Sequence, residues 1–219
     1  VQEEDADGNV ITGDERRDVM ICDYKYNWDK EIYNHVKVVN KNGKDWYPGK
    51  WRREWMPIGY KNPNVTDVNF CYLRYADVVL MAAEAYNETG DTSEAWKLLN
   101  SVRKRAGARE ITTENYTELM KEKVYKLNFI SDADDAGKFR TALYWERGFE
   151  LAFEGQRKYD LIRWGVIKEA LTLFSSRSSV KSSYPAGDNF QKGKHELFPI
   201  PLDELQLNPM FESKNNPNY

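Results

Sequence analysis

The charged residues best placed for chemistry lie in one amphipathic stretch, YWERGFELAFEGQRKYDLIRWG. Glu146, Glu150 and Glu154 are four residues apart, so they share one face of a helix. Three carboxylates could hold a metal ion, but carboxylate sites in bundles also use Glu-x-x-His, and neither His35 nor His195 is placed that way. Because arginine forms bidentate ion pairs with carboxylates, we predict a network that pins helices together, with no metal and no cofactor. The other charged residues in this stretch are Arg147, Arg157, Asp160 and Arg163.

A second group of candidate residues is aromatic and lies between residues 19 and 60. Four of the seven tryptophans occur here, and Asp, Asn, Lys and Arg side chains alternate with the rings. Flat rings can stack on the C–H faces of sugars while nearby polar groups bind hydroxyls, which is the general composition of a small-molecule site. Alternatively, the rings form a core for a segment that lacks aliphatic residues, because tryptophan is highly buried on average. The residues that we nominate for glycan binding are Trp28, Trp46, Tyr47, Trp51 and Trp55.

Nucleophilic catalysis has little support in the sequence. Neither Cys22 nor Cys71 has a histidine marked by its spacing, and no Gly-x-Ser-x-Gly elbow or phosphate-binding glycine loop occurs. The two cysteines could pair or stay reduced, so they do not define a redox compartment. We therefore expect a binding protein and not an enzyme.

Composition restricts the partners and the location of the chain. The net charge of −3 gives no electrostatic support for a nucleic-acid partner. The longest apolar run, Val78 to Ala83, is far too short to span a membrane. The chain starts at Val1 without methionine, signal peptide or lipid-anchored cysteine, so we expect that a targeting segment, or far more, has been removed.

Residues 71–107 predict the scaffold that carries these groups. Leu73, Ala76, Leu80 and Ala83 recur with the period of a half-buried helix. Gly90 is placed where a helix end needs positive φ, and the residues after it, Asp91, Thr92 and Ser93, are candidate caps for a second helix. The spacing matches a tetratricopeptide unit, which cannot bury both of its faces without neighbours.

The rest of the chain divides into a loop-rich aromatic segment, residues 1–64, and a helical domain, residues 65–219. Within the first segment, 1–18 read as a loop or frayed terminus, and alternation around Tyr24–Trp28 and His35–Val39 suggests short strands. The second contains helix pairs at about 71–106 and 139–174, a possible helix at 115–127 and a polar loop at 175–194. The tail at 195–219 is expected to be extended, to lie on the helices and to contain one helical turn at Leu202–Leu207. The two helices of the second pair are expected at about 139–153 and 157–174, with the turn at Gly155. The predicted fold class is all-α, with tetratricopeptide-like repeats, long irregular loops and minor short strands.

Four motifs in this order resemble the SusD/RagB family of surface glycan-binding lipoproteins. They are YLRYADVVLMAAEAYNETG, AWKLLNSVRKRAG, ERGFELAFEGQRKYDLIRWG and FPIPLDELQLNPMF. The resemblance runs from about residue 14 to the end and covers only the C-terminal half of a family member. The family usually closes on Gln-Asn-Pro-Gly-Tyr, whereas this chain closes on NNPNY. Because asparagine can adopt positive φ, we expect the tail geometry to survive.

The resemblance implies a helical scaffold whose loops bind glycan at the outer membrane. It also implies a lipid anchor in the full-length protein, a TonB-dependent outer-membrane transporter as partner, and an N-terminal half of the same protein that this chain lacks. The family's sugar contacts vary, so the nominated rings depend on the aromatic pattern alone. The alternative function is a repeat adaptor that binds a peptide or a partner helix; a carboxylate enzyme is the least favoured reading.

Overall fold

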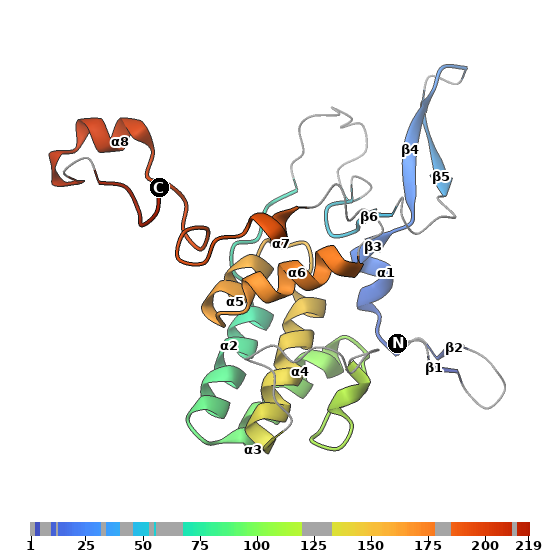
Figure 1. The fold of residues 1–219 in the computed structure, drawn as a ribbon. Helices are drawn as coiled ribbons and strands as arrows, with labels where there is room; N and C mark the ends of the chain where they lie inside the picture. The colour runs from blue at the N-terminus through green and yellow to red at the C-terminus, as the bar shows by residue number, and fades with distance from the viewer. Residues whose placement is uncertain are drawn as a thin grey trace. The chain divides into compact units, whose positions relative to one another are not determined.

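The computed structural model describes residues 3–4, 10–11, 13–31, 34–39, 46–52, 55, 68–119, 133–177, 185–211 and 214–219 (Figure 1). The chain divides into two compact units. Unit 1 contains residues 1–125 and 130–157, and unit 2 contains residues 126–129 and 158–219. Most of the regular structure is helical and the strands are short, so the predicted fold class is confirmed.

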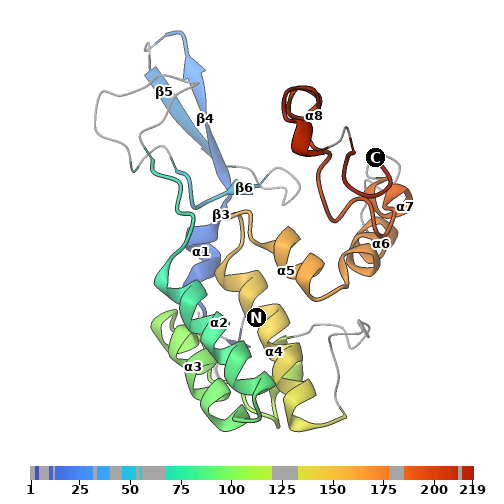
Figure 2. The ribbon, with the colours of Figure 1, turned by 90° about the vertical axis from the view of Figure 1, so that its left-hand side faces the viewer.

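Three helices form the core of unit 1. Helix α2 (Tyr75–Glu88) packs along α3 (Thr92–Arg105), and α4 (Asp135–Glu150) packs against both (Figure 2). The side chains between them are fully buried and apolar, which is the expected product of the helical periodicity. They include Leu80, Ala83, Leu99, Phe139 and Leu143.

The turn between α2 and α3 has the predicted geometry. Gly90 adopts a φ of +95°, a conformation that glycine reaches without the steric cost of a side chain. The Asp91 carboxylate then accepts the backbone N–H of Glu94 at 3.0 Å and caps α3. Both predictions are confirmed, and Asp91 is the cap among the three candidates.

The N-terminal part of unit 1 is more ordered than the composition predicted. Helix α1 (Arg16–Met20) begins within the segment 1–18 that we expected to be loop, and it is held because Arg16 is buried among carboxylates. Three two-stranded antiparallel ladders accompany it, and one of them includes the predicted strands around Tyr24 and His35. The ladders are β1 (Glu3–Glu4) with β2 (Val10–Ile11), β3 (Ile21–Cys22) with β6 (Tyr47–Pro48), and β4 (Tyr24–Asp29) with β5 (Asn34–Val39).

The segment before α4 departs from the prediction. Within the predicted helix 115–127, the structure has a 3₁₀ turn, η3 (Tyr116–Leu119), and residues 120–132 lie outside the described part of the chain. Helix α4 begins four residues earlier than expected because Asp134 caps it, accepting the backbone N–H of Gly137 at 2.6 Å.

Unit 2 corrects the prediction of one helix over 157–174. The structure has α5 (Arg157–Arg163) and α6 (Ile167–Arg177), separated at Gly165, whose φ is +69°. A short helix, α7 (Ala186–Asn189), follows within the stretch predicted as loop, and it lies close to α6 because Gly187 has no side chain. A Cβ there would come within 2.8 Å of the Thr172 backbone.

The tail contains α8 (Leu202–Leu207), as predicted, and a 3₁₀ turn, η5 (Pro209–Phe211). None of the residues of α8 is buried, so the expectation that the tail lies on the helices is wrong at this element. Asn218 has a φ of +69°, so the expectation that asparagine adopts a positive φ here is confirmed. Its side-chain amide donates to the Gly193 carbonyl at 2.9 Å and holds the end of the tail.

Candidate functional site

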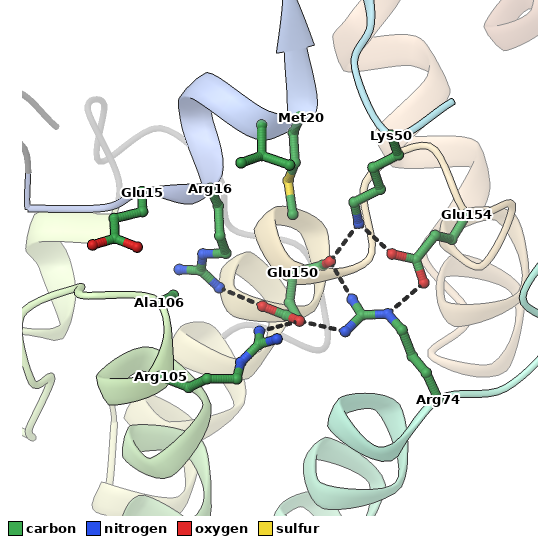
Figure 3. Close-up of a pocket in the computed structure, with 10 residues that line it drawn as sticks. Glu15, Arg16, Met20, Lys50, Arg74, Arg105, Ala106, Glu150 and Glu154 are labelled. Atoms are coloured by element: carbon green, nitrogen blue, oxygen red, sulfur yellow. Dashed lines mark hydrogen bonds and ion pairs between the residues drawn. The ribbon is translucent and has the colours of Figure 1, made fainter. Parts of the chain in front are cut away.

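The carboxylates of the charged motif form the centre of an ion-pair network in unit 1 (Figure 3). Glu146 is fully buried and accepts hydrogen bonds from Arg16 at 2.5 Å and Arg103 at 2.6 Å. Helix α4 ends at Glu150, so Glu154 lies in the turn after it and not on the same helix face as predicted; it pairs with Arg74 at 2.7 Å and with Lys50. We call Arg16, Lys50, Arg74, Arg103 and Arg105, together with the three glutamates, the α4 charge network.

Glu150 is the most highly connected member of this network. Its side chain is 1% exposed and accepts hydrogen bonds from three guanidinium groups. The donors are Arg16 at 3.0 Å, Arg74 at 2.5 Å and Arg105 at 2.5 Å. They come from α1, from the residue before α2 and from the end of α3, so a single carboxylate ties three segments to α4.

Burial and pairing oppose each other in the pKa values of the network. Burial alone would raise the pKa of Glu150, but Arg74, Arg16 and Arg105 hold it below its ordinary value. For Lys50 the outcome is reversed, because burial lowers the pKa of the ammonium more than Glu154 raises it. Glu150 is therefore held as an anion, and Lys50 is held in place at a cost in desolvation.

The network leaves an open cavity of about 320 Å³ beside α4, lined in part by Lys50, Arg74, Arg105 and Glu150. Every one of its glutamates is engaged by cations, and among the described residues no group of three or more His, Cys, Asp or Glu side chains could hold a metal ion. The predicted ion pairs of these glutamates are therefore confirmed. Two arginines of the charged motif pair elsewhere, Arg147 with Asp77 and Arg163 with Asp160.

The loop that carries Lys50 and Trp51, one of the rings nominated for glycan binding, is fixed against the end of α1. The Gly49 N–H donates to the Met20 carbonyl at 2.6 Å, and a Cβ on Gly49 would lie 2.2 Å from the Val19 carbonyl oxygen. Arg52 donates to the carbonyls at the end of α1, including that of Asp18 at 2.5 Å. Only glycine fits at position 49, and this close approach determines where the following side chains project.

Trp51 joins the aromatic segment to the helices. Its ring stacks on Phe70 with centroids 5.4 Å apart and planes 12° from parallel, and its indole N–H donates to the Phe153 carbonyl at 3.2 Å. Phe153 has a φ of +65°, which is unusual for a bulky residue, and its side chain is exposed. The Tyr72 ring makes an edge contact with the Phe70 ring, with centroids 5.2 Å apart.

Three of the other nominated rings lie at the surface. Trp46, Tyr47 and Trp55 have exposed side chains, at 47%, 45% and 53% of their full areas. Tyr47 belongs to β6, where it is paired with Cys22 of β3. Trp28 is in β4 opposite His35, but its side chain lies outside the part of the structure that is described.

Sequence reasoning missed Phe70, which is 51% exposed and forms the stacked pair with Trp51. The signal available was the alternation of aromatic residues in Phe70-Cys71-Tyr72, just before the helix pair. The nomination of aromatic residues stopped at residue 60, and stacking across the chain has no local signature. Both cysteines are free in the structure; Cys22 is buried and Cys71 is exposed.

Unit 2 has a cavity of its own, of about 510 Å³, lined mainly by apolar residues of α5, α6 and α7. His195 lines it and accepts the Gln191 N–H at its Nδ1 at 2.9 Å. Among the described lining residues this cavity contains no serine, threonine or cysteine that could act as a nucleophile. No helix in the described part of the chain is both long and apolar enough to cross a membrane.

Known proteins resemble this chain along almost its whole length. The model of the SusD family matches residues 2–219. SusD-like protein P25 of Formosa agariphila is 37% identical over 142 residues, or 65% of this chain, and SusD-like protein P2 of the same organism is 32% identical over 88% of it. The crystal structure of a SusD homologue from Bacteroides thetaiotaomicron superimposes over 94% of the chain, with a TM-score of 0.70 and 30% identity.

These relatives are much longer than this chain. The matches cover 23% of P25, 38% of P2 and 41% of the crystallised homologue. The chain belongs to the SusD family.

Proposed function

We propose that this chain belongs to a non-catalytic protein that binds oligosaccharide or polysaccharide at the cell surface. Its binding surface is formed by Trp46, Tyr47, Trp51, Trp55 and Phe70. The observation that carries the proposal is the exposure of four large rings, those of Trp46, Tyr47, Trp55 and Phe70, in the segment before the helical core, with the half-buried Trp51 stacked on Phe70. Loops on such a scaffold are the usual position for binding residues.

The chemistry of the surface suits sugars better than ionic ligands. Stacking uses the faces of the rings, which are flat and apolar, and the nearby polar groups can bind hydroxyls. Lys50, which precedes Trp51, is already paired with Glu154. Family membership supports the same function, because the relatives carry SusD-like names.

The rest of the proposal follows the family. The protein delivers the glycan to a TonB-dependent transporter in the outer membrane, and a lipid anchor in the full-length protein holds it on the cell surface. Trp28 remains a nominated contact on the basis of the sequence alone.

The test is to replace Trp46, Trp51, Trp55 and Phe70 singly with alanine and to measure retention in gels containing polysaccharides together with the melting temperature. Trp46 and Trp55 are about half exposed, so their loss should change the free energy of unfolding by no more than about 0.5 kcal/mol. Retention should fall for at least one of them. The matched control is Tyr159→Ala, because Tyr159 is a ring of similar exposure, 58%, on α5. The proposal fails if no substitution lowers retention at an unchanged melting temperature.

A further inference from the structure

The cavity in unit 2 is separate from the aromatic residues proposed to bind glycan. It is lined by residues of α5, α6 and α7 and of the segment that follows α7, and all of its described lining residues belong to unit 2 (Figure 1). Its volume of about 510 Å³ lies within the range of about 300–1,000 Å³ that is typical of small-molecule sites. We call it the unit 2 cavity.

Most of the lining of the unit 2 cavity is apolar and buried. Leu161, Ile167 and Phe190 are each no more than 9% exposed, and Leu171 and Ala186 add further apolar surface. The Phe190 ring makes an edge contact with the ring of His195, which also lines the cavity, with centroids 5.7 Å apart. Aromatic rings pack favourably against such pairs, so the body of a suitable ligand is an apolar ring.

Hydrogen bonds and a close backbone approach hold the walls in place. Gly187 allows α7 to lie against α6, since a Cβ there would come within 2.8 Å of the α6 backbone. After α7, the His195 N–H donates to the Gln191 carbonyl at 3.1 Å, and the Asn218 amide donates to the Gly193 carbonyl at 2.9 Å. A ligand does not have to order walls that are already held in this way, which reduces the cost of binding.

Three polar side chains of the lining have hydrogen-bonding groups that no described residue uses. The Lys158 Nζ lies 3.9 Å from the centroid of the Phe198 ring, and this lysine forms no ion pair with the described part of the chain. His195 accepts the Gln191 N–H at Nδ1, so the proton of its neutral ring is on Nε2, which is left as a donor. The side-chain amide of Asn189 also has no partner among the residues that the structure describes.

The described lining contains a cation but no carboxylate. The acidic residues closest in sequence to Lys158 and His195 are engaged elsewhere. Asp160 pairs with Arg163 at 3.0 Å, and Glu196 accepts the Gly193 N–H at 2.8 Å. An ammonium group and an imidazole N–H are donors, so the group that complements them is an anion, and a carboxylate accepts charge-assisted hydrogen bonds from both.

The cavity beside α4 shows the opposite arrangement. Its cations Lys50 and Arg74 are paired with Glu150 and Glu154, so the protein itself supplies the carboxylates. In the unit 2 cavity the apolar walls are present and the carboxylate is not. The two cavities therefore differ in whether a negatively charged ligand has a cation to bind.

We propose that the unit 2 cavity binds a small aromatic carboxylate. The ring of the ligand packs against the apolar side chains of α5 and α6, and its carboxylate is held by Lys158 and His195. This inference does not depend on the glycan-binding proposal, because no residue of the unit 2 cavity belongs to the proposed glycan surface.

The first test measures the binding of 2-naphthoate by titration calorimetry to the full polypeptide encoded by the gene that contains these residues. The uncharged comparison ligand is 2-naphthalenemethanol, which has the same ring and no carboxylate. We expect one molecule of 2-naphthoate to bind per chain, at least about tenfold more tightly than the alcohol, because the alcohol lacks the charge-assisted hydrogen bonds. No binding of 2-naphthoate at about 1 mM, or equal affinities for the two ligands, would overturn the proposal.

The second test locates the bound ligand with variants of the same polypeptide. Lys158→Gln should weaken 2-naphthoate by about tenfold or more and leave the affinity for the alcohol unchanged. The matched control is Lys168→Gln, because Lys168 is an exposed lysine of α6 that does not line the cavity, and it should change neither affinity. Ala186→Leu narrows the cavity and should weaken both ligands at a temperature where the variant is folded. Equal affinities of Lys158→Gln and the wild type for 2-naphthoate, or equal losses in the two lysine variants, would show that the ligand binds elsewhere.

Discussion

Replacing Glu150 with glutamine tests whether the α4 charge network holds unit 1 together. Glutamine has nearly the same shape but no charge, and its amide nitrogen cannot accept a hydrogen bond. Glu150 Oε1 now accepts from Arg74 and Arg105, and Oε2 accepts from Arg16. In the variant, an NH₂ group replaces one of these oxygens, so a hydrogen-bond donor faces a guanidinium group.

The magnitude follows from the burial of each partner. Arg105 is 58% exposed, and its pair with Glu150 should contribute no more than about 1 kcal/mol. Arg16 and Arg74 are 8% and 23% exposed, so they lose a buried counter-ion. Breaking a buried pair from one side costs about 3–5 kcal/mol. For a chain of this length, that loss corresponds to a fall of about 6–20 °C in melting temperature.

The assay is thermal and urea unfolding followed by tryptophan fluorescence at pH 7. The matched control is Glu94→Gln, which removes an exposed ion pair with Lys97 and should cost less than about 1 kcal/mol. Similar losses for the two variants, or a loss below about 1 kcal/mol for Glu150→Gln, would refute the reasoning. The network would then be a consequence of the fold and not one of its supports.

Four further predictions concern pH, packing and binding. The pKa of Glu150 is lowered in the folded protein, so its stabilising contribution is complete at neutral pH. This contribution begins to fall near the ordinary pKa of 4.5 and is lost as the pH drops through the lower, folded-state pKa. In acid unfolding experiments the stabilities of the wild type and Glu150→Gln should therefore converge as the pH falls. Ala83→Leu should overpack the α2–α3 contact and cost about 1–3 kcal/mol, whereas Ala85→Leu, at an exposed position of the same helix, should change the free energy of unfolding by less than about 0.5 kcal/mol in these 219 residues. Gly49→Ala should lower both melting temperature and glycan retention, because the added Cβ would overlap the Val19 carbonyl and displace Trp51; unchanged retention would argue against Trp51 as a contact. Glycan binding should vary little between pH 6 and 8, with an affinity of about 4–8 kcal/mol, since stacking needs no titrating group; a large change in titration calorimetry across that range would contradict it.

The helix pair could be predicted from the sequence because its determinants are local. The period of the apolar residues, the glycine at position 90 and the cap at Asp91 each act within a few residues, and the structure has all three. The break at Gly165 was equally local but was missed, since apolar spacing continues through it from Leu161 to Leu171 and outweighs one glycine in a sequence pattern.

Arg16 illustrates what the sequence does not determine locally. The acidic, glycine-containing surroundings of residues 1–18 are typical of a loop, yet Arg16 is only 7% exposed and helix α1 begins there. Its burial is stabilised by Glu146 and Glu150, which are 130 and 134 residues away. The spacing of the carboxylates predicts that they will form ion pairs. It does not predict which of the chain's many arginines and lysines will be the partners.

Two residues of the α4 charge network are sequence neighbours of the residues that hold the Trp51 ring. Lys50 precedes Trp51, and Glu154 follows Phe153, whose carbonyl accepts the Trp51 indole N–H. The ion pair between Lys50 and Glu154 therefore brings together the two backbone segments that hold the indole. Desolvation lowers the pKa of Lys50 and makes this pair a weak source of stability, so its main effect is to fix geometry. A buried ion pair can in this way set the position of an aromatic ring.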